Sequence, residues 1–189
     1  MSVLILNGSP NKKGAVASLL QEVAGGIAPG REVEWIDVYD LNMQPCRGCM
    51  RCRPDGRCIL PEDDAHRVGE KMRRAEGLVV GTPTHWANMS AQLKVLLDRN
   101  VPAVMGRTPR GLPAGRHKGK PALIVTACST PRLLNLLAAQ SKGALRAVRE
   151  VLRCGGYSIK QSLVFAGSSA ESGLPARLLR KARAAGSHV

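Results

Sequence analysis

The sequence predicts an α/β fold in which helices cover both faces of a parallel sheet. Its 189 residues suit one domain. With 44% hydrophobic and 22% charged residues, the composition is that of an ordinary water-soluble globule. Short apolar runs alternate with longer amphipathic segments along the chain. This alternation is typical of βαβ units, which build parallel sheets.

Five short apolar runs rich in β-branched residues are the predicted strands. They span residues 3–6, 33–38, 78–81, 122–126 and 158–165. Runs of this length that are apolar throughout are consistent with strands buried on both faces. Right-handed crossovers between them leave few possible topologies.

The segments between these strands are the predicted helices. They span residues 15–27, 61–75, 90–99, 131–153 with a break near Gly143, and a short basic helix with a frayed end from Ser172 to residue 189. Acidic residues follow Pro61, where they would face the positive end of the second helix. A cysteine-rich excursion at 40–61 and a basic loop at 101–120 interrupt the alternation. Because no repeat and no second core are visible, we predict a single domain over 1–189.

The charge balance limits the classes of function. The formal net charge is +14, and the isoelectric point is near 10.2. Such a charge is consistent with binding of nucleic acid, with attraction of anionic small molecules, or with a basic surface that is simply solvated. Because arginine and lysine are spread along the whole chain, nucleic acid is the weaker interpretation. No signal peptide and no membrane-spanning stretch are visible, so we expect a cytoplasmic protein whose six cysteines serve metal or redox chemistry.

Ligands of doubly wound sheets bind beyond the carboxyl ends of the strands, which here directs attention to residues 7–18, 82–90 and 126–132. The first loop contains Gly8 and Gly14 and enters a helix, so its backbone could approach a phosphate. Ser9, Asn11 and Ser18 could add donors. The loop has no Walker A or GxGxxG pattern, and a plain strand–helix turn is the alternative.

The second loop presents Thr84, His85 and Trp86 in succession after Pro83. Its backbone N–H groups could bond the edge of a flavin ring, and Trp86 could cover the face of that ring. Alternatively, Trp86 is a core or interface aromatic residue and His85 an exposed loop histidine.

These loops resemble those of the NADPH-dependent FMN reductase family. The resemblance rests on Asn7-Gly8-Ser9-Pro10 with Gly14, on Gly81-Thr82-Pro83 with Trp86, and on 89–94 followed by Asp98-Arg99. It spans roughly residues 2–165. It implies a flavodoxin-like three-layer sandwich, with a five-stranded parallel sheet in the order 2-1-3-4-5 and bound FMN.

The resemblance also implies a set of FMN-binding residues. The phosphate set is Ser9, Asn11, Gly14, Ala15 and Val16, and the ring set is Pro83, Thr84, His85, Trp86 and Asn88. From their places in the three loops we add Ser18, Met89 and Cys128 as cofactor-binding candidates. The family often has Gly-Asn-Thr where this chain has Gly14-Ala15-Val16, so backbone N–H groups and Ser18 must carry more of the phosphate. His85 stands where the family often has tyrosine. Cys128 either reports the redox state near the flavin or is a buried, inert thiol.

Four cysteines form the sharpest local pattern, namely Cys46-x2-Cys49-x2-Cys52-x5-Cys58. The compact start is typical of a 4Fe-4S cluster, while a four-cysteine zinc site and uncomplexed thiols are the alternatives. The segment resembles that of the iron–sulfur flavoproteins, a branch of the same family, which implies a 4Fe-4S cluster close to FMN. Arginines at 47, 51, 53 and 57 would stabilise thiolates and raise the potential of a cluster, or are simply solvated.

Three hypotheses of function follow. The first is an NAD(P)H-dependent reductase of flavins or quinone-type acceptors, in which Arg107, Arg110, Arg116 and Lys118 meet the nicotinamide cofactor's phosphates. The second is an electron carrier that takes electrons from a ferredoxin-like donor. The third is a zinc-bearing nucleic-acid or regulatory module without flavin. The family implies a homodimer or homotetramer with subunit contacts near the flavin loops.

Overall fold

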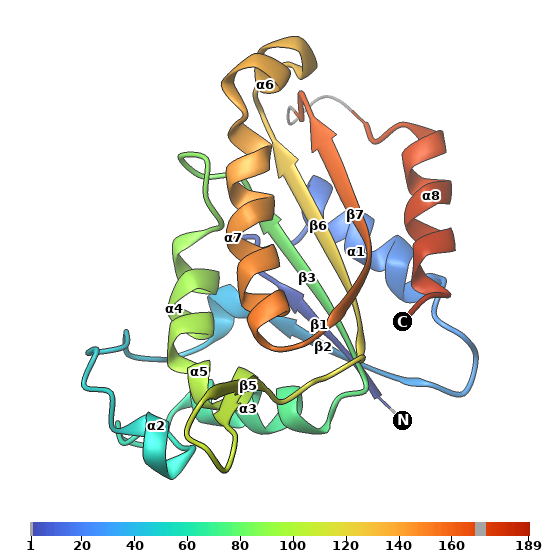
Figure 1. Cartoon of the computed structure of the whole chain (residues 1–189). Coiled ribbons are helices and arrows are strands. Elements are labelled where there is room, and N and C mark those ends of the chain that lie inside the picture. The colour runs from blue at the N-terminus through green and yellow to red at the C-terminus, as the bar shows by residue number, and fades with distance from the viewer. Residues whose placement is uncertain (1, 169–172) are drawn as a thin grey trace.

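A five-stranded parallel sheet in the order β2-β1-β3-β6-β7 forms the centre of the computed structural model (Figure 1). The structure describes residues 2–168 and 173–189. The strands are β1 (Ser2–Asn7), β2 (Glu32–Asp37), β3 (Gly77–Pro83), β6 (Pro121–Cys128) and β7 (Ser158–Ala166). Every pairing between them is parallel. Since β6 and β7 are the fourth and fifth strands of this sheet, the predicted fold and strand order are confirmed.

Alternate residues of the central strands enter two different cores. Leu4 and Leu6 of β1 belong to one buried cluster, whereas Val3 and Ile5 belong to the other. Successive side chains of a strand point to opposite faces, so a strand covered on both sides must be apolar throughout. This explains why the sequence shows continuous apolar runs rather than alternation.

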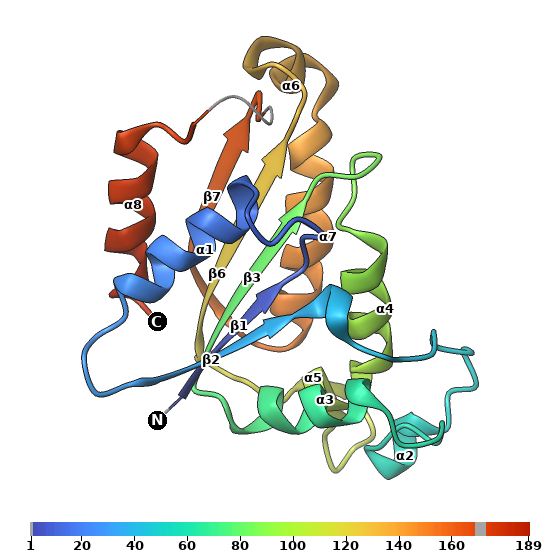
Figure 2. The same cartoon turned by 180° about the vertical axis from the view of Figure 1, so that it is seen from behind.

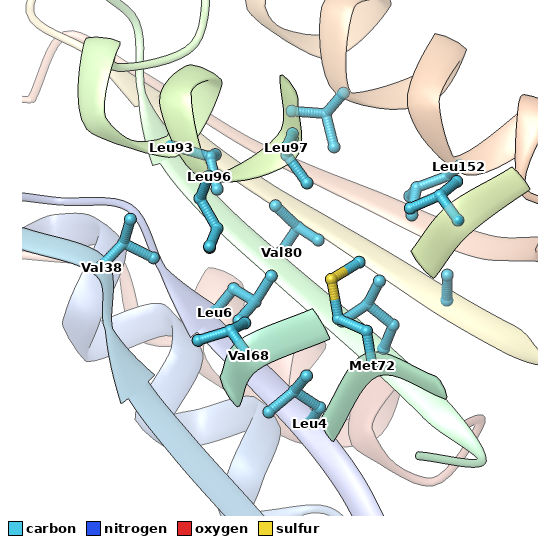
Figure 3. Packing of buried hydrophobic residues seen from close by; sticks show 14 of the residues in the cluster. Leu4, Leu6, Val38, Val68, Met72, Val80, Leu93, Leu96, Leu97 and Leu152 are labelled. Atoms are coloured by element: carbon cyan, nitrogen blue, oxygen red, sulfur yellow. The ribbon is translucent and has the colours of Figure 1, made fainter. Parts of the chain in front are cut away.

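Helices cover both faces of the sheet, as Figures 1 and 2 show from opposite sides. One face carries α1 (Ala15–Gly25) and α8 (Ala176–Gly186). The other carries α3 (Asp64–Arg74), α4 (Ala91–Arg99), α5 (Val101–Val104) and α7 (Gln140–Cys154). In Figure 3, Leu6 and Val80 of the sheet lie among side chains of α3 and α4. The remaining elements are η1 (Val38–Asp40), α2 (Cys52–Asp55) and α6 (Arg132–Ala138).

The segment predicted as a basic loop at 101–120 contains regular structure. It begins with α5 and continues as an antiparallel hairpin of β4 (Met105–Arg107) and β5 (Pro113–Gly115). His117 anchors the segment because its buried ring bonds the Ala103 carbonyl through Nε2 (3.0 Å) and stacks on Tyr157 at 4.5 Å. Pattern reasoning failed here because these contacts join residues far apart in the sequence.

The helix predicted over 131–153 breaks at Ala139, not near Gly143. Ala139 adopts a left-handed conformation with φ 54° between α6 and α7. The Asn135 side chain bridges the break, because its Nδ2 donates to Ser141 Oγ (2.8 Å) and its Oδ1 accepts from the Ser141 N–H (2.9 Å). Gly143 lies inside α7, where a Cβ atom would come within 1.9 Å of the Ala87 carbonyl oxygen.

The other predicted helices are present with small differences at their ends. Asp63 caps α3, accepting from the Ala65 N–H (3.1 Å), and His66 completes a capping box. The last helix begins at residue 176, and its predicted start at Ser172 lies outside the described residues. Among the helices of the described ranges, none combines the length and apolar character needed to cross a bilayer.

Candidate functional site

A cavity of about 650 Å³ opens at the carboxyl edge of the sheet. Its walls come from the β1–α1, β3–α4 and β6–α6 loops and from the segment after β7. The lining residues are Ser9, Asn11, Lys13, Gly14, Ala15, Val16, Ser18, Pro83, Thr84, His85, Ala127, Cys128, Ser129, Ser168, Gly173 and Leu174. A volume of this size accommodates an organic cofactor. The three loops that follow the carboxyl ends of strands, and were expected to bind a ligand for that reason, therefore meet at one site.

The β1–α1 loop is shaped by its own side chains. The Ser9 N–H donates to Asn7 Oδ1 (3.2 Å), the Asn11 N–H to Ser9 Oγ (3.2 Å), and the Lys13 N–H to Asn11 Oδ1 (3.0 Å). Asn7 is fully buried and also donates through Nδ2 to Asp37 Oδ1 (2.7 Å). The loop is therefore preformed, and the oxygens of Ser9 and Asn11 serve its backbone.

The start of α1 lies against the cavity. Gly14 is the N-cap residue, with φ −82° and ψ 176°, and no side chain of the described residues caps this helix end. Ala15 and Val16 of the first turn line the cavity together with Lys13. First-turn N–H groups have no partner within their helix, and the helix dipole makes this end positive. The cavity thus offers an anion both backbone donors and a lysine.

Buried hydrogen bonds join the first two loops beneath the cavity. The Ser90 hydroxyl donates to the Gly8 carbonyl (2.6 Å), and the Ser90 N–H donates to Thr82 Oγ1 (2.9 Å). The Gly8 N–H donates to the Gly81 carbonyl (2.8 Å). A Cβ atom on Gly8 would lie 2.8 Å from that same oxygen, so glycine permits the close approach.

The β3–α4 loop closes in a tight turn. His85 and Asn88 exchange two backbone hydrogen bonds of 2.9 Å, which leaves Trp86 and Ala87 at its tip. Both tip residues have positive φ, 51° and 56°, the conformation of a type I′ hairpin that glycine or asparagine usually supplies. The turn therefore stores backbone strain and places Trp86 in solvent, 99% exposed.

Three of the predicted cofactor residues do not line the cavity. Trp86 stands on the exposed tip of the turn. The Asn88 side chain accepts from the Met89 N–H (2.8 Å), and Met89 is buried in the core with residues of α4. The reason is the reversal at 86–87, which turns the chain away from the cavity before α4 begins.

Six lining residues were absent from the sequence prediction, namely Lys13, Ala127, Ser129, Ser168, Gly173 and Leu174. Lys13 belongs to the first loop and carries the charge that a phosphate site favours. The last three follow β7, whose carboxyl end lies on the same edge of the parallel sheet. The segment after the fifth strand would therefore also have been expected to contribute to the site.

Cys128 lies on the wall of the cavity and is buried, with its Sγ 3.8 Å from the Thr130 carbonyl oxygen. Burial raises the pKa of its thiol, against the opposing effect of nearby backbone hydrogen bonds. A thiol of raised pKa is neutral near pH 7, so Cys128 contributes a small, weakly polar surface.

The segment that carries four cysteines, residues 41–63, is termed the cysteine loop. Cys46 and Cys49 are exposed on an irregular stretch, while Cys52 starts α2 and Cys58 follows it, both half-buried. In the described ranges no three cysteine, histidine or acidic groups are gathered closely enough to hold a metal ion. The expected convergence of the four thiols is therefore not shown.

The other three cysteines nevertheless lie close enough to Cys52 to affect its pKa. Burial raises the pKa of Cys52, and negative charge on Cys58, Cys46 and Cys49 raises it further. The loop is thus a local concentration of thiols, with a 260 Å³ cavity beside Cys52 that Met105 and Arg107 also line.

Helix α4 contacts both the cavity loops and the cysteine loop. Its N-cap Ser90 bonds the cavity loops, whereas Arg99 at its far end bonds the cysteine loop. The nine-residue helix is about 14 Å long. In Figure 1 the cysteine loop, which contains α2, extends outward from α4 and returns to α3. Arg107, Arg110, Arg116 and Lys118 do not line the large cavity, and the Arg116 Nε bonds the Pro102 carbonyl instead (3.0 Å).

The sheet order defines a flavodoxin-like α/β protein, with a cavity at the carboxyl edge of its sheet. The sequence matches the NADPH-dependent FMN reductase family over residues 1–171. The chain therefore belongs to this family.

Similar proteins include two curated archaeal iron–sulfur flavoproteins. One, from Methanocaldococcus jannaschii, is 37% identical over 107 residues, 56% of this chain and 55% of the relative. The other, from Archaeoglobus fulgidus, is 39% identical over 107 residues, 56% of this chain and 52% of the relative. The chain thus spans about half the length of the curated relatives it matches.

Among solved structures, the NAD(P)H:quinone oxidoreductase from Methanothermobacter marburgensis superposes with a TM-score of 0.72. It is 22% identical, and the match covers 98% of this chain and 94% of that one. At this identity the likeness shows the fold.

Proposed function

We propose that the chain binds FMN in the 650 Å³ cavity and acts as an NAD(P)H-dependent reductase of flavin or quinone-type acceptors. The observation that carries the proposal is the uncapped start of α1, which faces the cavity beside Lys13. Membership of the NADPH-dependent FMN reductase family supports the choice of ligand. When bound, FMN supplies the hydride chemistry.

The residues of the cavity suit the two ends of such a ligand. The N–H groups of Ala15 and Val16 and the ammonium of Lys13 suit the phosphate. Pro83, Thr84 and His85 at the end of β3 and Ala127 to Ser129 at the end of the neighbouring β6 offer backbone and side-chain groups to a flat ring. Thr84 is held in place because its N–H donates to the Ala127 carbonyl (2.7 Å). The site therefore positions the ligand, and no side-chain acid or base is required.

The choice of a quinone-type acceptor draws on the name of the solved quinone oxidoreductase with the same fold. A titration of the flavin-free protein with FMN, followed by NADPH oxidation with and without a quinone, tests the proposal. We expect saturable FMN binding and quinone-dependent oxidation. Binding of FMN without oxidation of NADH or NADPH would reject the reductase activity and keep the flavin site.

A second candidate function is that of an iron–sulfur flavoprotein that carries electrons from an acidic ferredoxin-like donor. The cysteine spacing, the effect of the other three cysteines on the pKa of Cys52 and the names of the curated relatives favour it. The spacing and thiol chemistry fit a 4Fe-4S cluster. Rapid reduction by a ferredoxin, in a protein that does not oxidise NADPH, distinguishes this function. A colourless preparation that contains zinc would reject both candidates.

We also propose that the chain forms a homodimer or homotetramer through α6. Its exposed side chains include Leu133, Leu134, Leu136 and Leu137, between 55% and 76% exposed. Gathered exposed apolar side chains are typical of protein–protein contact sites. Because α6 follows the cavity-lining end of β6, a second copy seated there would lie near the proposed flavin site.

A further inference from the structure

One guanidinium group joins the two ends of the cysteine loop. Arg99, at the end of α4, has a fully buried side chain. Its Nη1 donates to the Gln44 carbonyl (2.7 Å) and to Asp63 Oδ2 (2.6 Å), and its Nη2 donates to Asp63 Oδ1 (3.0 Å). Gln44 precedes the first cysteine and Asp63 follows the last one. Arg99 therefore lies at the base of the loop and bonds both of its ends.

Further hydrogen bonds close the same base. The Gln44 N–H donates to Asp63 Oδ2 (3.2 Å), and the Asn42 N–H donates to Asp64 Oδ2 (2.7 Å). The His66 ring contacts the Cys58 carbonyl through Nε2 (3.2 Å). These bonds converge on the acids at the start of α3, and Arg99 connects them to α4.

Arg99 also lies near a cysteine. Burial acts to lower the pKa of Arg99, but its hydrogen bonds to Asp63 and the nearby Cys58 thiol outweigh this effect and raise the pKa. Arg99 and Cys58 line one small cavity of about 20 Å³. Within the described residues, the buried Nε of Arg99 has no protein partner. The guanidinium therefore keeps an N–H donor that is not bonded to Asp63.

We propose that Arg99 is a positioning residue of the cysteine site, which closes the base of the loop and presents a buried positive charge to Cys58. The part that concerns a cluster rests on the proposed 4Fe-4S cluster, whereas the closure of the loop does not. Buried charges are screened less than exposed ones. Such a charge favours the more negative, reduced form of a cluster and so raises its reduction potential.

Arg57 provides a matched control. It precedes Cys58 directly, carries the same charge, and is 66% exposed in an ion pair with Glu62 (2.5 Å). Solvent screens such a pair, so its removal should have little effect. Arg57→Gln and Arg99→Gln thus remove equal charges near one cysteine from an exposed and a buried position.

The first test follows amide hydrogen exchange across residues 41–63 in the cluster-free protein. We expect exchange to accelerate by about tenfold or more in Arg99→Gln, because hydrogen bonds to a charged group are lost. Arg99→Lys should accelerate it as well, since an ammonium cannot bridge Asp63 and the Gln44 carbonyl with the fork geometry of a guanidinium. If Arg99→Gln does not fold, Arg99→Lys carries this test. Unchanged exchange in the folded variants would overturn the closure of the loop by Arg99.

The second test measures the midpoint potential of the reconstituted cluster. We expect Arg99→Gln to shift it to more negative values, Arg99→Lys to restore most of the difference, and Arg57→Gln to leave it nearly unchanged. Equal shifts in Arg99→Gln and Arg57→Gln would overturn the role of the buried charge. If the wild-type chain takes up no iron, the proposal of a cluster is rejected. The exchange experiment then still tests whether Arg99 closes the loop.

Discussion

Gly143 of α7 lies directly against the carbonyl of Ala87, so closely that a Cβ atom on Gly143 would be 1.9 Å from that oxygen. The contact joins the first turns of α7 to the strained tip of the β3–α4 loop. Ala87 and Trp86 both have positive φ, and a strained turn persists only where its surroundings hold it. His85 lines the cavity and directly precedes this tip. The position of His85 therefore depends on Gly143, which is far away in the sequence.

Gly143→Ala is expected to displace the turn and to weaken FMN binding by about tenfold, because the added methyl group forces Ala87 away. Fluorescence titration with FMN measures the effect. Gly77→Ala is the control, because a Cβ atom there would meet only ordinary contacts of 3.5 Å. Equal affinities in wild type and Gly143→Ala would show that the turn does not shape the flavin site.

Lys13→Gln is expected to lower the affinity for FMN by about fivefold and to leave riboflavin binding unchanged, because only FMN carries a phosphate. Higher salt should shrink the difference. Lys12→Gln is the matched control, since Lys12 pairs with Asp40 (2.5 Å) and does not line the cavity. A loss of riboflavin binding in Lys13→Gln would contradict the assignment of this lysine to the phosphate end.

The stability of the protein should fall on acidification because of His117. Burial lowers the pKa of this histidine, and the nearby charges of Lys120, Arg116 and Arg73 lower it further, against the bond to the Ala103 carbonyl. A carbonyl only accepts, so Nε2 carries the proton, and in the described residues the buried Nδ1 has no partner. The neutral ring is therefore the native form.

Since the folded-state pKa lies below the unfolded value, the unfolded chain binds a proton first. The free energy of unfolding is unaffected by His117 above about pH 6.5 and falls below it, by at most about 1.4 kcal/mol per pH unit. Urea unfolding of wild type and His117→Gln between pH 7 and 5 measures this slope. Identical slopes in the two proteins would reject the role of His117.

Leu133→Glu combined with Leu137→Glu is expected to reduce the oligomer to monomers, because two carboxylates would be buried in the proposed subunit contact. Both leucines are at least 70% exposed in one chain. Sedimentation velocity reports the mass. Leu112→Glu, at a 62% exposed site on the β4–β5 hairpin, is the control. A wild-type chain that sediments as a monomer would contradict the proposed contact.

The fold was predictable because its signals are local. Apolar runs such as 3–6 and 78–81 must be strands buried on both faces, and turn residues separate them from amphipathic helices. The first cavity loop was predictable for the same reason, since Gly14 and its neighbours directly follow a strand and open a helix.

Features that depend on distant contacts were not predictable. The exposure of Trp86 is one of them, since it stands at the tip of the reversal at 86–87, and Ala87 of that reversal packs against Gly143 of α7. The hairpin in 101–120 depends on His117 and Tyr157. The hydrogen bonds at the base of the cysteine loop depend on Arg99, which the sequence analysis noted only as part of a family motif. Sequence spacing alone carries no information about such pairs.

The most direct test of the account is the visible spectrum of the protein purified without oxygen, with flavin, iron, sulfide and zinc assayed on the same sample. We expect flavin bands with about one FMN per chain, and a broad shoulder with iron and sulfide if the cysteine loop holds a cluster. Flavin bands without iron would leave the reductase proposal standing and remove the electron-carrier candidate. A protein without flavin bands that also fails to bind added FMN would contradict the central claim.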